Sequence, residues 1–475
     1  MESKQSRYIT TTLPYVNADP HIGFALEIVQ ADALARLWRA LGHDVFFTTG
    51  TDEHGQKIYE KAREHGQEVQ AYVDHYAVQF EKLKAALGLS FDAFVRTTDA
   101  RHVAAAQEMW RRCAAKGDIY KKTYKGLYCV GDEAFMKESD LVDGRCPNHP
   151  NTPLVEIEEE NYFFKLSNYQ EQLLAYLSDS SVIIPDWRRE EAIAFVTQGL
   201  EDFSISREAS RMSWGIPVPD DETQVMYVWF DALTNYISTL GWPDDPQGLF
   251  QKFWEDGETL QVAGKDQVRF QSIMWQAMLM SADVSTTDCV FYHGFITSGG
   301  QKMSKSIGNV ISPFEMVEKY GTDATRYILL RHVHPVADTD ITWERMDEWY
   351  NANLANGLGN LAARIMKMAE THLAAPVSCA PVTLSSVESP VALDQHMEMV
   401  WNTISALDER IAEDEPFKLI KQDVEAARAI ITELVRGLHT VASMLAPVLP
   451  DTAEKILIAI RENRKPETLF ARIDA

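Results

Sequence analysis

The chain has 475 residues, of which 45% are hydrophobic, so it is long enough for roughly two to four domains with their own cores. No stretch of about 18 apolar residues runs without a charge, and residues 1–8 are polar with no apolar segment behind them, so we expect neither a membrane span nor a secretory signal. Lys and Arg number 45 against 70 Asp and Glu, and the net charge of −25 argues against unselective binding to nucleic acids or anionic membranes.

The first fifty residues predict a strand, a turn, a helix and a second strand. Residues 7–13 are rich in β-formers, residues 14–23 carry two prolines and a glycine, residues 24–41 place apolar side chains at helical spacing, and residues 44–49 form an apolar run. This order predicts a right-handed βαβ unit in a parallel sheet, in which ligands bind at the carboxyl ends of the strands.

The middle of the chain changes character twice. Residues 57–87 and 100–117 are helical in pattern, whereas residues 119–213 are aromatic and β-rich with a Cys/His cluster, which predicts an inserted domain. The α/β pattern then resumes with three short apolar runs that lead into polar loops and helical stretches. These runs are residues 225–230, 260–263 and 290–293.

Beyond Trp349 the pattern is helical, which predicts an α-helical bundle at the end of the chain. Residues 374–390, with three prolines and four serines, predict a long loop within it. The expected helices are residues 353–371, 393–414, 417–446 and 451–462.

Neither a P-loop nor a G-x-G-x-x-G fingerprint occurs, so any phosphate must be bound by other segments. Two short segments have suitable residues. At residues 20–23 a histidine and a glycine open a strong helix, where backbone N–H groups and the helix dipole favour an anion. At residues 299–306 two lysines and two serines follow paired glycines. Taken alone, the first segment is more often a helix cap or surface residue, and the second is more often a solvated turn.

Together, His21-Ile22-Gly23 near the start, an inserted domain, Lys302-Met303-Ser304-Lys305-Ser306 and a helical tail resemble the class I aminoacyl-tRNA synthetases. Further segments make the chain similar to the methionyl-tRNA synthetases over nearly its whole length. They are Leu13-Pro14-Tyr15-Val16-Asn17, Gly50-Thr51-Asp52-Glu53-His54-Gly55, Ile205-Ser206-Arg207, Tyr227-Val228-Trp229-Phe230-Asp231-Ala232, Gly264-Lys265-Asp266 and Asn360-Leu361-Ala362-Ala363-Arg364.

The resemblance implies an α/β fold in which a Rossmann-like catalytic domain is split by an inserted domain of zinc-knuckle type and followed by an α-helical bundle. The implied boundaries are 1–117 and 214–298 for the two catalytic halves, 118–213 for the insertion, 299–349 for the lysine loop and stem-contact region, and 350–475 for the anticodon-binding bundle.

The implied reaction is attack of the methionine carboxylate on the α-phosphate of ATP, followed by transfer of the methionyl group to tRNA(Met) for initiation and elongation. Such chemistry needs positioning and charge neutralisation more than a covalent nucleophile. The resemblance assigns catalysis to His21, Lys302 and Lys305. It also implies that Mg²⁺ binds together with ATP. Its further ATP-binding residues are Gly23, Lys265, Asp266 and Ser304. The family's second signature histidine is replaced here by Phe24, which cannot donate to phosphate.

Methionine recognition is likewise implied by the resemblance. Asp52 matches the family residue that takes the substrate ammonium group, and a carboxylate suits that role. Aromatic rings suit the thioether, although such residues would otherwise be read as core. The matching positions are Leu13, Tyr15, Trp229, Ala232 and Tyr236, with Gln271 where many relatives carry histidine and Met274 at a nearby aromatic position.

The insertion contains a C-x₂-D and C-x₂-H pair with zinc-knuckle spacing: Cys129, Asp132, Cys146 and His149. Similar methionine enzymes carry a third cysteine at the Asp132 position, so three interpretations remain open: a structural Zn²⁺ site, a relic knuckle and a thiol pair. The five cysteines are an odd number in a long chain without a signal segment, so we expect no disulfide framework and a cytoplasmic location.

The tail is not basic, with 12 Lys and Arg against 17 Asp and Glu in residues 351–475, so tRNA recognition must rest on a few placed groups. Asn360 and Arg364 match the family residues that read the anticodon, and Phe417 falls where relatives often have a stacking tryptophan. Without the resemblance, Asn360 and Arg364 would be interpreted as an i,i+4 pair on a helix surface and Phe417 as a core residue.

Two rival interpretations remain. An enzyme for leucine, valine or cysteine shares the class, but an insertion of about 95 residues is too small for the large editing domain of the branched-chain enzymes. The second rival is a catalytically dead paralogue that only binds tRNA. The presence of His21, Asp52, Lys302 and Lys305 argues against it. No extension follows the bundle, so we expect a monomer.

Overall fold

The computed structural model describes residues 5–131, 134–136, 140–303, 308–385, 387 and 389–473. The chain divides into two compact units. The first comprises Met1–Pro20, Val45–Lys82 and Phe91–Tyr292, and the second comprises His21–Asp44, Leu83–Ser90 and His293–Ala475.

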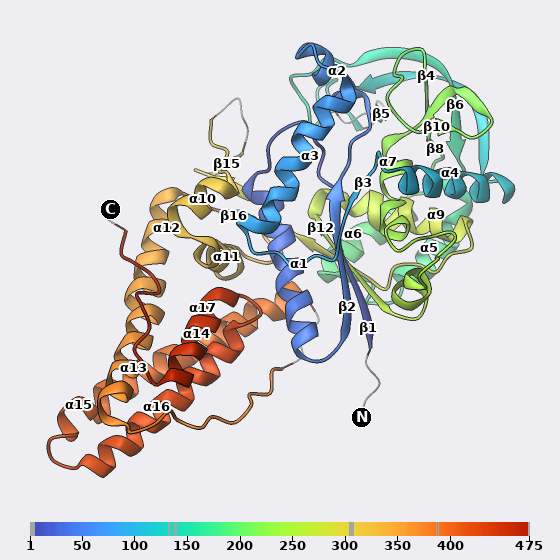
Figure 1. Cartoon of the computed structure of the whole chain (residues 1–475). Coiled ribbons are helices and arrows are strands. Elements are labelled where there is room, and N and C mark those ends of the chain that lie inside the picture. The colour runs from blue at the N-terminus through green and yellow to red at the C-terminus, as the bar shows by residue number, and fades with distance from the viewer. Residues whose placement is uncertain are drawn as a thin grey trace. The chain divides into compact units, whose positions relative to one another are not determined.

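The first unit is built on a six-stranded sheet in the order β3-β2-β1-β12-β13-β7 (Figure 1). β12 runs parallel to β1, β3 to β2 and β7 to β13, so the parallel sheet predicted from the sequence is confirmed. The strands are β1 Ser6–Thr11, β2 Asp44–Thr51, β3 Ala93–Arg96, β7 Ile183–Ile184, β12 Glu258–Gly264 and β13 Cys289–His293.

The helices of this unit include α2 Gln56–Glu64, α3 Val69–Ala86, α4 Ala100–Ala115, α7 Val228–Ala232, α8 Asn235–Ser238 and α9 Trp275–Ser281, with π-helical segments at Gln251–Glu255 and Phe270–Met274. Of these, α4, α7, α8, α9 and the two π-helical segments contribute to the main apolar cluster of the unit. The single helix expected over residues 57–87 is wrong, because Gly66 adopts φ +63° and ends α2 before α3 begins.

The predicted insertion forms an antiparallel sheet in the order β5-β4-β6-β8, with α5 Gln170–Leu177 and α6 Asp186–Thr197. Its strands are β4 Ile119–Cys129, β5 Ala134–Met136, β6 Val155–Phe164 and β8 Phe203–Ser204. Within the same stretch of sequence, however, β7 returns to the main sheet beside β13.

A three-stranded sheet follows, built from β9 Ser206–Glu208, β10 Pro217–Val218 and β11 Asp221–Met226. The apolar run at residues 225–230 therefore does not rejoin the main sheet. Its first two residues end β11, and the rest begins α7.

The second unit is mainly helical. α1 Ile22–Ala40 packs against α11 Thr322–Arg331 and α14 Pro390–Asp414. Asp32 on α1 and Arg326 on α11 form a buried ion pair of 2.7 Å, and the Arg326 guanidinium also donates to the carbonyl oxygen of Val448 at 2.8 Å. A buried charge pair is tolerated when its remaining donors are satisfied, as they are here.

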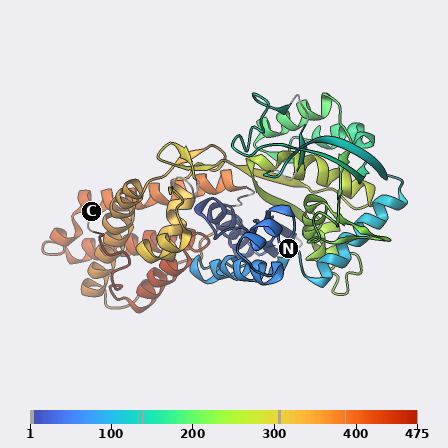
Figure 2. The same ribbon diagram turned by 90° about the horizontal axis from the view of Figure 1, so that it is seen from above.

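The end of this unit is a helical bundle, in orange and red in Figure 2. Its helices are α13 Asn360–His372, α14, α15 Pro416–Leu419, α16 Val424–Leu445 and α17 Pro450–Glu462, preceded by α10 Pro313–Tyr320, α12 Trp343–Trp349 and a π-helical segment at Tyr350–Gly359. The predicted bundle is confirmed, and the expected loop separates α13 from α14. The expected helix over residues 417–446 is two helices, because Asp423 caps α16 by accepting from the Ala426 N–H at 2.9 Å.

Candidate functional site

The strand order of the first unit places one candidate site at the carboxyl ends of its central strands. From β1 the chain order runs outward through β2 and β3 on one side, whereas β12 and β13 lie on the other. Such a switch point is where open α/β sheets bind ligands. Tyr15 follows β1, Asp52 follows β2 and Lys265 follows β12, so the sequence-predicted residues of this unit gather at the expected edge.

The polar part of this edge is Asp52, which is 3% exposed. A backbone bridge joins it to the segment after β1: the Asp52 N–H donates to the Pro14 carbonyl oxygen at 3.0 Å, and the Val16 N–H donates to the Asp52 carbonyl oxygen at 3.2 Å. The carboxylate itself accepts from the His54 N–H at 3.4 Å. A buried acceptor held this firmly is suited to a cation that brings its own hydrogen bonds.

The apolar part comes from α7 and α8. Trp229 stacks on Phe270 with ring centroids 3.8 Å apart and an interplanar angle of 13°. Tyr236 is buried, and its hydroxyl accepts from Gln271 Nε2 at 2.6 Å. Tyr15 and Trp229 pack against the same core cluster that contains Tyr236. Phe270 was not among the residues predicted from the sequence, although it directly precedes Gln271, which was.

A cavity of about 510 Å³ in this unit borders the aromatic group. Phe270 and Met274 line it together with Arg207 and Tyr227, and the Arg207 guanidinium lies 4.6 Å from the centroid of the Tyr227 ring. Arg207 belongs to the Ile-Ser-Arg segment of the sequence resemblance. Its position ties that segment to the neighbourhood of the Trp229 and Phe270 rings.

Lys265 and Asp266 form a short 3₁₀ turn, Lys265–Gln267, directly after β12. Lys265 is half-buried and Asp266 is exposed, and Gln267 Nε2 donates to the Asp266 carboxylate at 3.2 Å. Both residues lie on the turn that leaves the central strand, as a ligand contact at a switch point requires.

His21, in the second unit, is the N-cap residue of α1. Its Nδ1 accepts from the Gly23 N–H at 3.0 Å, and a Cβ atom on Gly23 would lie 2.8 Å from His21 Cε1. A side chain at position 23 would therefore push the imidazole away from the helix start. The Ile22 N–H donates to the Ile311 carbonyl oxygen at 3.1 Å, so these first two amides already have acceptors within the protein. Phe24 is buried within α1.

The lysine signature follows a tight hairpin of the second unit. β14 Ile296–Ser298 pairs with β15 Gln301–Lys302, and the two connecting glycines adopt φ of +63° and +73°, as the favoured two-residue turn requires. Lys302 thus ends a strand. Ser304, Lys305 and the side chain of Lys302 lie outside the described residues, so their predicted roles stay predictions.

Three of the four predicted metal ligands come together in the insertion. Ligand atoms of Cys129, Cys146 and His149 all lie within 4.8 Å of one another. The His149 Nδ1 atom is 4.0 Å from the Cys129 Sγ and 3.9 Å from the Cys146 Sγ. Two thiols and an imidazole at such distances suit a tetrahedral Zn²⁺ ion. Asp132, the predicted fourth ligand, lies outside the described residues.

If Asp132 completes this site, purified protein should contain about one Zn²⁺ per chain, and Asp132→Cys should keep or tighten it, because thiolate is a softer ligand than carboxylate. Metal analysis of both proteins before and after dialysis against a chelator measures the difference. Cys146→Ser is the matched control and should lose the metal. Zinc-free wild-type protein would leave the relic knuckle as the interpretation.

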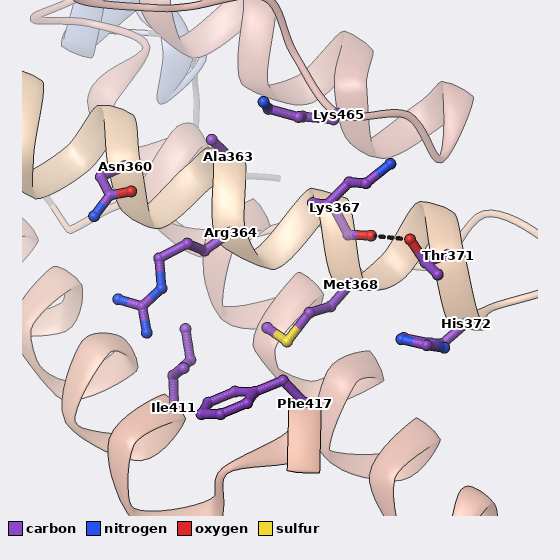
Figure 3. Close-up of a pocket in the computed structure, with 10 residues that line it drawn as sticks. All are labelled: Asn360, Ala363, Arg364, Lys367, Met368, Thr371, His372, Ile411, Phe417 and Lys465. Atoms are coloured by element: carbon purple, nitrogen blue, oxygen red, sulfur yellow. Dashed lines mark hydrogen bonds between the residues drawn. The ribbon is translucent and has the colours of Figure 1, made fainter. Parts of the chain in front are cut away.

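A second candidate site lies in the bundle, in a cavity of about 450 Å³. Figure 3 shows Met368 pointing from α13 toward Phe417, which is 46% exposed, and Arg364 extending from the same helix toward Ile411. Arg364 is held by Asp408 at 2.6 Å. The cavity is lined by Asn360, Ala363, Arg364, Lys367, Met368, Thr371, His372, Ile411, Phe417 and Lys465.

The three sequence-predicted residues of the tail, Asn360, Arg364 and Phe417, thus line one cavity. Among its described lining residues three are Lys or Arg and none is acidic, although the whole chain carries −25. Lys465 comes from the segment after α17 and was missed, since nothing local in the sequence links it to Asn360. Arg364 is paired with Asp408 and Lys367 with Glu370, so the basic side chains are held in place beside one exposed ring, an arrangement suited to an unstacked nucleotide.

Within the described part of the chain no helix is long and apolar enough to cross a membrane.

Known proteins match this chain over almost its whole length. The family model described as tRNA synthetases class I (M) matches residues 7–153 and 149–366. The methionine–tRNA ligase of Fusobacterium nucleatum is 39% identical over 95% of this chain and 74% of its own length, and that of Rhizobium meliloti is 39% identical over 96% and 92%. The solved structure of Mycobacterium tuberculosis methionyl-tRNA synthetase in complex with methionyl-adenylate matches with a TM-score of 0.88 and 37% identity, covering 99% of each chain.

Proposed function

The chain belongs to the methionyl-tRNA synthetases of class I, and from this premise we propose that the two sites described above are its methionine-activating centre and its anticodon-reading surface. The protein is a methionine–tRNA ligase: it activates methionine with ATP and transfers it to tRNA. The similarity over almost the whole chain to a structure that holds methionyl-adenylate is the observation that carries this conclusion.

In the first step a methionine carboxylate oxygen attacks the α-phosphorus of ATP, and pyrophosphate leaves. Asp52 would hold the substrate ammonium group, because it is a buried carboxylate directly after β2, at the carboxyl end of the central strands. The apolar side of the pocket would take the thioether, for which stacked aromatic rings are favourable partners. Its residues would be Leu13, Tyr15, Trp229, Ala232, Tyr236 and Gln271.

The residues that would bind the triphosphate are His21, Gly23, Lys302, Ser304 and Lys305, and those that would bind the adenosine are Lys265 and Asp266. His21 would donate to phosphate from Nε2, because its Nδ1 accepts from the Gly23 N–H at 3.0 Å. Mg²⁺ bound with ATP would supply further charge neutralisation.

In the second step a hydroxyl of the terminal adenosine of tRNA attacks the methionyl carbonyl carbon, and AMP leaves. The tRNA would be selected at the bundle cavity, where Phe417 supplies a stacking ring and Asn360 and Arg364 supply hydrogen bonds. Lys367 and Lys465 on its rim would meet phosphate. We further propose the domain boundaries given by the sequence, a structural Zn²⁺ in the insertion, a monomer and a cytoplasmic location.

Phe417→Ala should raise the apparent KM for tRNA about ten- to a hundredfold, because loss of one stacked base costs roughly 1–3 kcal/mol. Methionine-dependent pyrophosphate exchange should scarcely change, since Phe417 lies in the bundle. Both reactions should be measured on one preparation, with a native CAU anticodon and a mutated one.

Met399→Ala is the matched control, because Met399 is an exposed apolar side chain of α14 that does not line the cavity. It should leave charging unchanged. A Phe417→Ala protein that still discriminates the two anticodons as well as wild type does would remove Phe417 from recognition. Loss of exchange together with charging would show that the ring only stabilises the bundle.

A further inference from the structure

A fully buried aspartate lies directly behind the proposed methionine pocket. Asp231 is 0% exposed and belongs to α7, between Trp229 and Ala232. Its Oδ2 is 2.8 Å from His54 Nδ1, and its Oδ1 is 2.9 Å from His102 Nε2. A carboxylate is expensive to bury unless each oxygen is paired, and here both oxygens are.

The hydrogen bonds determine which atoms carry protons. Each ring nitrogen that faces Asp231 must donate, because an ionised carboxylate only accepts. The other nitrogen of His102 is 2.9 Å from the Ser238 hydroxyl. A neutral His102 that donates from Nε2 therefore accepts from Ser238 at Nδ1, an assignment that follows from the partners.

Burial by itself raises the pKa of Asp231. Attraction to His54 and hydrogen bonds from both rings outweigh burial, so the pKa lies below the ordinary value of an aspartate. The group is thus a fixed carboxylate at neutral pH.

Three members of this network each follow a proposed pocket residue by two positions in the sequence. His54 comes two residues after Asp52, Asp231 two after Trp229, and Ser238 two after Tyr236. On a helix, residues two apart point in nearly opposite directions, so Asp231 and Ser238 face away from the side that Trp229 and Tyr236 present. One carboxylate on the reverse side therefore ties together the segments that carry the polar wall and the aromatic wall.

The segment around Asp52 has additional anchors. Glu53 is buried and accepts from Arg96 at 2.6 Å and 2.9 Å, and the Trp214 indole donates to the Glu53 carbonyl oxygen at 2.6 Å. These contacts hold the loop to β3 and to the segment before β10. The bonds of Asp231 to the two histidines connect His54 of this loop to α7, while His102 links α7 onward to α4 and α8.

We propose that Asp231 is a positioning residue for methionine: through His54 and His102 it fixes the spacing between the Asp52 carboxylate and the aromatic side chains Trp229 and Tyr236. The inference rests on the proposed function, since it presumes that these residues bind methionine. Asp231 itself touches no substrate. Its effect is on amino acid affinity, because a pocket that must hold an ammonium group and a thioether at once depends on the distance between its walls.

Asp231→Asn tests this in the full-length protein. The amide is nearly isosteric, but its Nδ2 group donates, so one ring would have to shift its proton to accept from it, and both rings would lose their hydrogen bonds to a buried carboxylate. We expect the Kd and the KM for methionine to rise about ten- to a hundredfold, as a displacement of about 1 Å at a binding site can produce. The KM for ATP should stay within about twofold of wild type.

The matched control is Asp118→Asn. Asp118 is also a buried aspartate of the first unit, 5% exposed, and accepts from Asn168, Tyr169 and Ser281, none of which is a proposed pocket residue. It should lower the thermal unfolding temperature without changing the Kd for methionine. Calorimetric titration with methionine and thermal unfolding, both run on each variant, separate pocket geometry from stability.

A second pair keeps the test decisive if Asp231→Asn does not fold. His102→Gln retains an N–H that can reach Asp231 and should keep near wild-type affinity for methionine, whereas His102→Leu should weaken it. Selective loss of methionine affinity in Asp231→Asn and His102→Leu supports the proposal. An unchanged Kd for methionine in both, or an equal loss in Asp118→Asn, would overturn it. Absence of methionine-dependent exchange in the wild type would instead overturn the proposed function.

Discussion

Lys305→Ala is expected to slow adenylate formation by roughly two orders of magnitude, a loss on the order of 3 kcal/mol of barrier, as for removal of one preorganised charged donor. The lysine of the second signature would act on the charge that develops on the departing pyrophosphate. Its contribution is therefore larger in the transition state than in the bound ground state. Single-turnover measurement of adenylate formation at saturating methionine and ATP gives the rate directly.

The affinity for methionine should stay close to wild type in the same variant, because Lys305 does not belong to the amino acid pocket. Lys319→Ala is the matched control, since Lys319 pairs with Asp347 on the surface of the same unit, outside the signature. It should leave the rate unchanged. Equal rates in wild type and Lys305→Ala would remove the lysine from catalysis.

Asp52→Asn should weaken methionine binding about a hundredfold, because a buried ionic hydrogen bond to the substrate ammonium is worth roughly 1.5–3 kcal/mol and its loss leaves that charge unpaired. Asparagine keeps an oxygen that can still accept from the His54 N–H, so the local backbone has no new unsatisfied donor. Calorimetric titration with methionine measures the change.

A ligand without the ammonium group makes this test specific. The deaminated analogue of methionine keeps the carboxylate and the thioether, and Asp52→Asn should change its affinity little. The affinities of wild type and Asp52→Asn for methionine and for the deaminated analogue then give the coupling free energy between the Asp52 carboxylate and the ammonium group. Equal losses for both ligands would mean that Asp52 shapes the pocket and does not bind the ammonium group.

Local patterns in the sequence predicted the elements that local forces determine. The first helix, expected over residues 24–41, is Ile22–Ala40, and the first strand, expected over residues 7–13, is Ser6–Thr11. Both have unbroken periodicity and a turn between them. The two helices predicted too long were each interrupted by a cap, a glycine in one and Asp423 in the other, which are signals that the sequence does contain.

The short apolar run at residues 225–230 was a different kind of error. Runs of this length do not distinguish a strand from a buried helix, and here the chain changes from β11 to α7 within it. That change matters for the site, because it places Trp229 and Asp231 on a helix, where they face different sides.

The candidate sites were predicted only as sets of residues, through the resemblance of short motifs. Contacts between distant residues were not predicted, because no local pattern encodes them. Asp231 and His54 are 177 residues apart, and Gln271 and Tyr236 are 35 apart. Lys465 likewise reaches the cavity of Asn360 only through the fold of the bundle. The sequence therefore indicated the chemistry of the pocket, and the structure added the network behind it.

Amino-acid-dependent ATP–pyrophosphate exchange, measured with each proteinogenic amino acid in turn, tests the central claim most directly. The reaction requires amino acid activation and needs no tRNA, so it separates an enzyme from a protein that only binds tRNA. We expect exchange with methionine and none of comparable rate with leucine, valine or cysteine. Exchange that is absent with methionine, or faster with another amino acid, would contradict the assignment of this chain as a methionine-activating enzyme.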